Sequence, residues 1–583
     1  MQSHYARGGK GEASSRNAQI RGAMLDSSHL NSLSKERRNN FGAAVIAACV
    51  VVICLFSGLG AVGLLGPDEP RYTWIARAMA ETGDWITPRL YGKPWFEKPI
   101  LYYWAAAVGF RVHLSSEVAA RLPSAIAALA AAIAIGWLGW KHYGFAENFR
   151  ESPALLAPLI FSTSVGAIGF SRAATPDMLF SALIALAMAS ASGVLRSQGL
   201  LRAAPEIVPK DSIRGNLDLT FFGVFLGLAA LAKGPAAVIL AGGAIGLWAL
   251  ATSRWRPALR LAHPIAIGAF CVVALPWYVI CAARNPDFLH VFIFQHNFER
   301  YLTPVFQHRQ PFWFFGWITL LAMLPWTVLL ISAGQEGLRL WREKSWSNSP
   351  GFFYACWAIF PIIFFSLSQS KLPGYILPSV PPLALLCAVS ASRVFKQRRS
   401  VAFLVSAGIG FVWVALALYV FFQARSIAMT DMGRFVPILL SEVLVVVTIL
   451  LAMILLFAGL RQNLVAVVAV CSVAVAATVA VAGLAILPAL DPYLSARPHA
   501  AFLRGDLRPD RIFTYRLNRS WNYGLAFYFR RELPEWSPNE PNAALVLTNQ
   551  KGLEEITKAG RIQGELNEVQ QGILYVPVSP LPR

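Results

Sequence analysis

Two short stretches of the chain place carboxylates and basic side chains directly beside an apolar segment. The first follows residues 41–63, which are long and apolar enough to cross a bilayer as a helix, and the second lies near residue 97. Charged groups beside a bilayer are expensive, and those found there tend to be functional. Carboxylates together with Lys and Arg suit an enzyme that handles a hydroxyl and a phosphate at a membrane surface. The charged residues are Asp68, Glu69, Arg71, Glu97 and Lys98.

Each of these stretches also has a purely structural interpretation. Asp68 or Glu69 could cap a helix that ends before Gly83. Glu97 and Lys98 could form an ion pair at the membrane surface, because aromatic residues flank them. The functional interpretation makes Asp68 a general base for a hydroxyl, lets Lys98 bind a phosphate oxygen, and lets Glu97 bind a metal ion or orient a cation.

Further polar groups lie in short segments between apolar runs. Asp177 follows Thr175 and Pro176, the pattern of a helix start, so either the helix dipole or a cavity explains its charge. Lys233 either extends to the interface or binds an anion in a cavity. Two histidines in the loop at 295–309 are a weak metal signal, because no HxxxH-type spacing supports them. Lys371 and Tyr375 lie in a Pro/Gly turn, where they could also be interface anchors. The candidates in these segments are Asp177, Lys233, His296, Arg300, His308, Lys371 and Tyr375.

The composition is that of a polytopic membrane protein. Of 583 residues, 56% are hydrophobic and only 14% are charged, whereas a soluble protein has about 25% charged residues. The net charge of +20 does not indicate nucleic acid, because the basic residues lie in short loops, where they set orientation and attract anionic lipids. The seven cysteines lie in apolar segments without CxxC spacing, so neither a disulfide framework nor a thiolate metal site is expected.

Thirteen apolar segments are predicted to span the membrane, and the segment Ile100 to Leu114 is short enough to be interfacial or re-entrant instead. About forty polar residues precede the first span, so a cleaved signal peptide is not expected there. The predicted spans are 41–63, 119–140, 152–171, 177–196, 217–232, 236–253, 262–283, 312–333, 351–368, 373–392, 401–423, 436–459 and 463–488.

The Lys and Arg bias predicts the orientation. Seven basic residues before the first span predict a cytoplasmic tail, disordered over 1–40, and an odd number of spans then places the C-terminus outside. We expect a transmembrane domain over 41–490, whose first outer loop is 64–116, and a periplasmic domain over 491–583. All candidate residues then fall on the outer side or at outer helix ends. No motif was used to predict the topology, so the convergence of these residues on one face is independent support for a single site there.

Two outer parts of the chain have readable local patterns. Within the first loop, Pro70 to Thr82 would form an interfacial helix whose apolar face contains Tyr72, Ile75 and Met79. After residue 491, ALVLT and ILYVPV are typical of strands, and SWNYGLAFYFRREL is typical of a helix. The C-terminal part is therefore predicted to be a small α/β domain docked on the membrane part.

Taken together and in order, the motifs resemble those of bacterial aminoarabinose transferases of lipid A and of the related protein O-mannosyltransferases. The resemblance runs from about Leu64 to Leu386 and is weaker beyond. It implies an all-α polytopic fold of the C-type membrane glycosyltransferases. The motifs are DEPRY at 68–72, GDWITPRLYGKPWFEKPILYYW at 83–104, SEVAARLPSAIAALA at 116–130, TPDMLF at 175–180, LAKGP at 231–235, HNFERYL at 296–302, HRQPFWFF at 308–315 and QSKLPGYILPSVPPLALL at 369–386.

The resemblance also implies roles for individual residues. Asp68 matches the catalytic carboxylate, and Glu69 beside it is also expected to be catalytic. Glu97 matches a residue that coordinates a divalent cation, Zn²⁺ or Mg²⁺. His296 would share that metal, although the related pattern has its histidine where this chain has Asn297. The donor phosphate would be bound by Lys98, Lys233, Arg300 and Tyr375, with Arg71, Asp177 and Lys371 as further polar groups of the cavity.

The implied function is that of an inverting glycosyltransferase in the bacterial inner membrane. It would move a sugar from an undecaprenyl phosphate donor to a hydroxyl or phosphate of lipid A, or of another envelope lipid or glycan, with its site in the periplasm. Membrane lipids are expected partners and nucleic acid is not. A protein O-mannosyltransferase is the alternative enzyme. A membrane transporter is a third interpretation, disfavoured because the charges cluster at one face and no repeat is visible.

Overall fold

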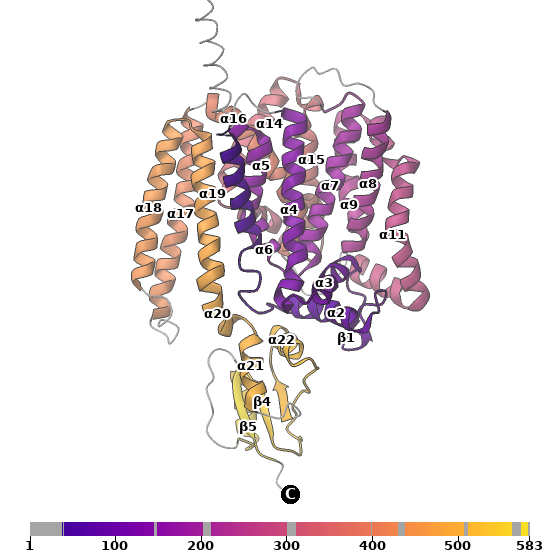
Figure 1. Cartoon of the computed structure of the whole chain (residues 1–583), viewed down its shortest axis with the longest axis vertical. Coiled ribbons are helices and arrows are strands. Elements are labelled where there is room, and N and C mark those ends of the chain that lie inside the picture. Colours follow the sequence, from indigo (N-terminus) through magenta and orange to yellow (C-terminus); the bar gives the residue numbers. More distant parts are fainter. Residues whose placement is uncertain are drawn as a thin grey trace, which may run out of the picture.

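The computed structural model describes residues 38, 40–144, 149–201, 212–299, 310–397, 399–428, 438–506, 511–562 and 573–580. These residues form a long bundle of helices with a small α/β domain at one end (Figure 1). The basic tail predicted to be disordered over 1–40 lies outside the described residues, apart from Arg38 and Asn40.

The bundle is built from long apolar helices. Among the described residues, eight helices are long and apolar enough to cross a membrane, or up to ten if each bent pair counts as one span. Each predicted span coincides with one of these helices, with a bent pair, or with a shorter apolar helix. The long helices are α4 (Ser116–Tyr143), α7 (Pro176–Ser197), α8 (Ser212–Lys233), α11 (Pro264–Arg284), α16 (Val380–Gln397), α17 (Arg399–Ala428), α18 (Ile438–Leu460) and α19 (Leu464–Val481).

The remaining bundle elements are shorter or bent. One pair, α5 (Pro153–Ser162) and α6 (Val165–Ser171), bends by 62°, and the helices 314–322 and 326–342 bend by 115°. In the second pair, 314–322 is α13 (Phe314–Ala322), and 326–342 consists of η4 (Trp326–Val328) followed by α14 (Leu329–Arg342). Others are Asn40–Phe56, η1 (Phe149–Glu151), α9 (Ala236–Thr252), α10 (Trp255–Leu259), η2 (Arg260–Ala262), η3 (His290–Glu299), η5 (Trp346–Asn348), α15 (Pro350–Ser366), η6 (Pro373–Ser379), η8 (Ala482–Ile486) and α20 (Leu487–Leu494).

Small residues bring the bundle helices close together. At Gly139 of α4, an added Cβ would lie 2.7 Å from the carbonyl carbon of Pro153 in α5. At Gly223 of α8, it would lie 2.1 Å from the carbonyl oxygen of Ala266 in α11. Membrane helices depend on such close approach because lipid supplies no hydrophobic drive for their association.

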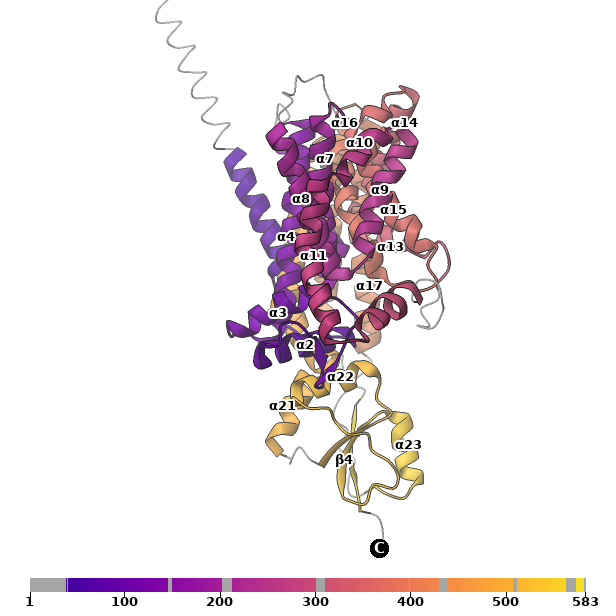
Figure 2. The ribbon, with the colours of Figure 1, turned by 90° about the vertical axis from the view of Figure 1, so that its right-hand side faces the viewer.

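The first loop folds into helices that lie across one end of the bundle. It contains α2 (Asp68–Thr82), a short antiparallel pair β1 (Arg89–Leu90) and β2 (Lys93–Pro94), and α3 (Leu101–Arg111). Both views place these elements at the end of the bundle nearest the small domain (Figures 1 and 2). The apolar face predicted for α2 is buried, and α3 confirms that the segment after Ile100 is a short helix rather than a span.

The C-terminal domain is a three-stranded sheet with helices. Its strand order is β3–β4–β5, with β3 and β4 parallel and β4 and β5 antiparallel. The two predicted strands and the predicted helix are present, while the remaining strand and two helices were not anticipated. The elements are α21 (Arg497–Asp506), β3 (Ile512–Tyr515), α22 (Arg519–Phe529), β4 (Ala544–Thr548), α23 (Gln550–Lys558) and β5 (Leu574–Val578).

Candidate active site

The start of helix α2 carries the first two predicted carboxylates. Pro67 is the N-cap residue and no side-chain capping bond forms, so the capping interpretation does not account for Asp68 and Glu69. Gly83 ends the helix in the left-handed conformation with φ of 75°, as predicted. The helix dipole still favours negative charge in this first turn. The two carboxylates are therefore free to bind other partners, and they face different ones.

Arg71 joins two of the predicted carboxylates. Its guanidinium pairs with Asp68 and donates to Oε2 of Glu97 at 2.9 Å. The side chain of Arg71 is only 7% exposed, whereas that of Asp68 is 45% exposed. Although burial opposes the charge of Arg71, the neighbouring Glu97 and Asp68 raise its pKa above the ordinary value. Asp68 is thus held in place by a permanently charged partner while part of its carboxylate remains open to solvent.

Glu97 is surrounded by groups that donate to it. The Tyr72 hydroxyl donates to Oε1 at 3.2 Å, and Lys98 Nζ lies 3.8 Å from the same oxygen. Burial, followed by the charge of Glu97, raises the pKa of Tyr72 well above its ordinary value, so this hydroxyl remains a donor. With Arg71 on the other oxygen, two cations already balance the Glu97 carboxylate.

A second charged group lies where three bundle elements end. Asp177, in the first turn of α7, pairs with Lys233, the last residue of α8. The Lys233 ammonium lies 5.0 Å from the ring centroid of Tyr375, a cation–π contact. Lys98 is close enough to Asp177 to interact with it electrostatically. Lys98 therefore links this group to the one around Glu97, and the structure brings most of the predicted residues together.

Glu69 faces away from this cluster. Its Oε2 accepts from Arg121 at 2.7 Å and from the Leu65 backbone N–H at 2.8 Å, and its Oε1 accepts from Ala174 N–H at 2.7 Å. Arg121 is 3% exposed and also donates to the carbonyls of residues 59, 62 and 63. This buried pair ties α2 and α4 to the loop before α2 and to the loop before α7. It holds the backbone from which Asp68 projects.

The other predicted residues have varied placements. Lys371 is buried and donates to the carbonyl of Ser368 at 2.6 Å. Arg300 and His308 lie outside the described residues, and the side chain of His296 is not described. Within the described ranges, no group of three or more His, Cys, Asp or Glu is arranged to hold a metal ion. The described neighbours of the Glu97 oxygens are Arg71, Tyr72 and Lys98, and the metal-binding role expected for Glu97 with His296 stays a prediction.

A cavity of about 530 Å³ opens beside Glu97. Its walls come from the first loop, from Arg284 at the end of α11, and from the segment after α11, which contributes Asp287. Arg284 is also 3.7 Å from Asp84 of the first loop. Sequence reasoning missed Arg284 and Asp287, because two charged residues near the end of an apolar helix have no local signature of a site. The lining residues are Pro94, Trp95, Phe96, Glu97, Arg284, Asn285, Pro286, Asp287 and Val291.

The C-terminal domain reaches the same cluster through α22. The ring centroid of Tyr523 lies 5.2 Å from the Arg71 guanidinium carbon. The Tyr528 hydroxyl donates to Glu117 at 2.7 Å and accepts from Leu64 N–H at 2.9 Å. The predicted docking of this domain on the membrane part is therefore present, and it covers one side of Arg71.

Comparisons with known proteins agree with this architecture. Residues 43–292 match the family described as dolichyl-phosphate-mannose-protein mannosyltransferase. Over 91% of its length the chain superposes on 97% of the crystal structure of ArnT from Cupriavidus metallidurans bound to undecaprenyl phosphate, with a TM-score of 0.71 and 21% identity. The chain has the same all-α polytopic fold as this ArnT structure.

Curated relatives carry the same resemblance at the level of sequence. The undecaprenyl phosphate-alpha-4-amino-4-deoxy-L-arabinose arabinosyl transferase of Erwinia tasmaniensis is 32% identical over 55% of this chain and 54% of its own length. The protein of the same name from Yersinia enterocolitica is 31% identical over 65% of each chain. The predicted resemblance to aminoarabinose transferases and protein mannosyltransferases is confirmed. The alignments span roughly half to two thirds of these relatives.

Proposed function

We propose that this membrane protein transfers a sugar from a polyprenyl phosphate donor to an acceptor at the membrane surface, as an inverting glycosyltransferase. The observation that carries the proposal is the cluster at one end of the bundle, where the half-exposed Asp68 lies beside Arg71, Glu97 and Lys98. The relatives named as aminoarabinose transferases, and the ArnT structure with bound undecaprenyl phosphate, support this donor.

The chemistry requires one bond to form as another breaks. The acceptor oxygen attacks the anomeric carbon, the bond from that carbon to the donor phosphate breaks, and polyprenyl phosphate leaves with the electron pair. Asp68 takes the proton of an acceptor hydroxyl as attack proceeds. Lys98 and Lys233 stabilise the negative charge of the leaving phosphate, and Arg300 joins them in this proposal. One displacement inverts the anomeric configuration.

The named relatives favour an amino sugar over a neutral one. Among the described residues of the cluster, three carboxylates (Asp68, Glu97 and Asp177) accompany three cations (Arg71, Lys98 and Lys233), and Arg300 would add a fourth cation for the donor phosphate. The relatives named as aminoarabinose transferases support transfer of 4-amino-4-deoxy-L-arabinose to lipid A, or to another envelope lipid or glycan, over protein O-mannosylation.

The decisive experiment is transfer by the purified protein. Undecaprenyl phosphate carrying aminoarabinose is compared with the same lipid carrying mannose, each with lipid A and with a Ser/Thr-rich polypeptide as acceptor. Mass spectrometry of the products should find aminoarabinose on lipid A. Mannosylated polypeptide as the main product would instead establish the second enzyme. Flux of a sugar lipid across proteoliposomes without any transfer product would support a transporter.

The metal expected from the sequence is tested separately. Zn²⁺ or Mg²⁺ bound by Glu97 and His296 would neutralise phosphate charge, but Glu97 is already paired with Arg71 and Lys98. We therefore expect transfer to persist after chelation with EDTA. A loss of activity that one divalent ion restores would return Glu97 to the role of a metal ligand.

We place the protein in the bacterial inner membrane, with the N-terminus cytoplasmic and the site and C-terminal domain periplasmic. The Lys and Arg bias of the loops supports this orientation. Alkaline phosphatase, which is active only in the periplasm, tests it when fused after residue 583. An active fusion is expected, and an inactive fusion of a folded protein would reverse the orientation.

A further inference from the structure

The end of the bundle opposite the proposed active site carries two adjacent cavities of different character. One is apolar, with a volume of about 390 Å³, between α8, α9 and the start of α11. The other is polar, with a volume of about 740 Å³, between the ends of α7, α8 and α10. Helix α10 lies near this end in Figure 2, far from α2 and α22. Both volumes fall in the range of ligand pockets, about 300–1,000 Å³.

The segment 255–262, formed by α10 and η2, separates the two cavities. Trp255 and Leu259 line the apolar cavity, although they are 49% and 66% exposed. Arg256 and Arg260, each one residue further along the chain, line the polar cavity and are exposed. One face of this short segment is therefore apolar and the other basic, the arrangement of a segment that lies in a membrane interface.

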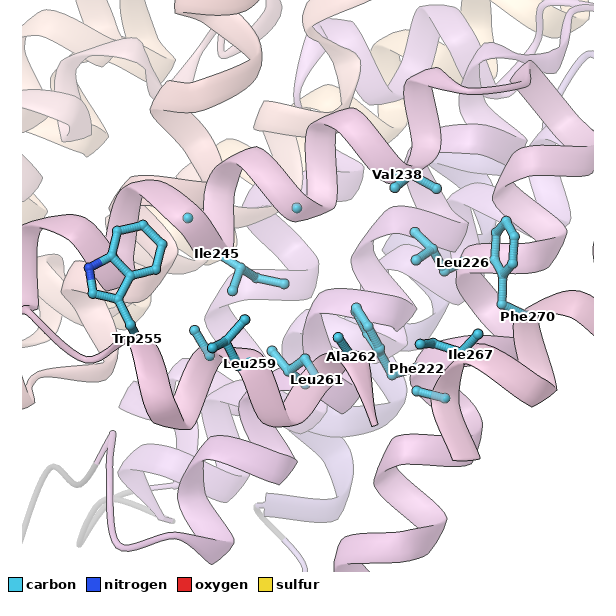
Figure 3. A pocket seen from close by; sticks show the side chains of 15 residues that line it. Phe222, Leu226, Val238, Ile245, Trp255, Leu259, Leu261, Ala262, Ile267 and Phe270 are labelled. Carbon is cyan, nitrogen blue, oxygen red and sulfur yellow. The ribbon is translucent and has the colours of Figure 1, made fainter. Parts of the chain in front are cut away.

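The apolar cavity lies on the side of α9 that faces α8 and α11. Helices α8 and α11 are in close contact at Gly223, whereas an added Cβ at Gly242 or Gly246 of α9 would meet no atom within 4 Å. Figure 3 shows Val238 and Ile245 on one side of the groove, and Leu226, Phe222 and Phe270 on the other. Such a groove at membrane depth accepts hydrocarbon.

The polar cavity adds a charge preference. Arg256, Arg260 and the exposed His263 line it, and no Asp or Glu is found among the described residues lining either cavity. A general excess of basic residues in loops on this side explains their charge, but it does not explain why an open apolar groove adjoins them. An anionic phospholipid has both features that these cavities would bind: a phosphate for the arginines and an acyl chain for the apolar groove.

We propose that these two cavities form one binding site for an anionic glycerophospholipid of the leaflet at this end of the bundle. The headgroup phosphate binds Arg256 and Arg260, and one acyl chain lies between α8 and α9. No residue of the proposed active site lines either cavity, and the proposal does not depend on the proposed function. The bound lipid fills the gap beside α9.

The test measures lipid binding to the delipidated full-length protein by native mass spectrometry. Phosphatidylglycerol and phosphatidylcholine with identical acyl chains are titrated separately. The wild-type protein should bind phosphatidylglycerol in preference. The double variant Arg256→Gln, Arg260→Gln should bind it about thirtyfold more weakly, since each basic residue near an anionic lipid surface contributes about 1 kcal/mol. The matched control is Arg342→Gln, Lys344→Gln, and it should retain the affinity. Both residues are exposed, Arg342 as the last residue of α14 and Lys344 just after it.

A second variant probes the groove without touching charge. Gly242→Leu places a side chain where the groove is open, and Gly268→Leu places the same side chain at an exposed position of α11 outside both cavities. The first should weaken binding and the second should not. Equal affinity for the two lipids, or unchanged binding in both the arginine and the Gly242 variants, would overturn the proposal. Full competition by inorganic phosphate would also overturn it, because it would leave the acyl chain without a role.

Discussion

The buried pair of Glu69 and Arg121 gives the sharpest test of how this site is built. Sequence reasoning placed Glu69 beside the catalytic carboxylate, whereas its oxygens bind Arg121 and two backbone N–H groups. Glu69→Gln replaces one acceptor oxygen with an NH₂ group, which faces donors, and leaves the guanidinium as an uncompensated buried charge. Breaking a buried ion pair in this way costs about 3–5 kcal/mol. We expect a loss of stability, not a specific loss of chemistry.

The assay follows unfolding in detergent with a thiol-reactive dye, because five of the seven cysteines are buried. Glu69→Gln and Arg121→Met should each lower the melting temperature strongly. The double variant should recover much of the loss, since it leaves no unpaired charge. The control is Glu81→Gln on the same helix, which is exposed and should change stability by less than about 0.5 kcal/mol.

Turnover is measured well below the melting temperature of each variant, and per folded molecule. Glu69→Gln should then retain most of the wild-type rate. A variant that melts like the wild type but has lost turnover would refute the structural role and make Glu69 catalytic.

Three further predictions concern single side chains. Asp68→Asn should lower kcat by about 10²–10⁴-fold, the usual contribution of a general base, while melting temperature and donor affinity are retained; wild-type-like turnover would exclude Asp68 as the base. Lys98→Ala should raise the KM for the donor about tenfold or more, because a hydrogen bond to a charged group is worth about 1.5–3 kcal/mol; unchanged KM and kcat would remove its phosphate role. Burial lowers the pKa of His499 in α21 below its ordinary 6.5, so below that pH the unfolded state binds more protons and the C-terminal domain loses stability. His499→Gln should flatten the dependence of the melting temperature on pH between about 7.5 and 5, and equal acid sensitivity of the two proteins would contradict this assignment.

Local sequence patterns predicted the membrane spans and several of the outer helices and strands of this protein. Apolar length predicted the spans, because a helix must satisfy its own backbone across about 30 Å of hydrocarbon. The spacing of Tyr72, Ile75 and Met79 predicted the buried face of α2. The apolar runs ALVLT and ILYVPV predicted β4 and β5, whereas β3 was missed because its four residues, Ile512–Tyr515, form too short a pattern.

Only the tertiary structure decided which charged groups meet. The carboxylates of Asp68 and Glu69 are adjacent in the chain, but successive residues of a helix point about 100° apart, so one joins Arg71 and the other joins Arg121. Arg121 lies 52 residues from Glu69, inside an apolar helix. No local pattern predicts such a partner, because the long-range packing of α2 against α4 selects it. The sequence by itself determined which segments enter the membrane and which residues could do chemistry, and packing determined which of them share a site.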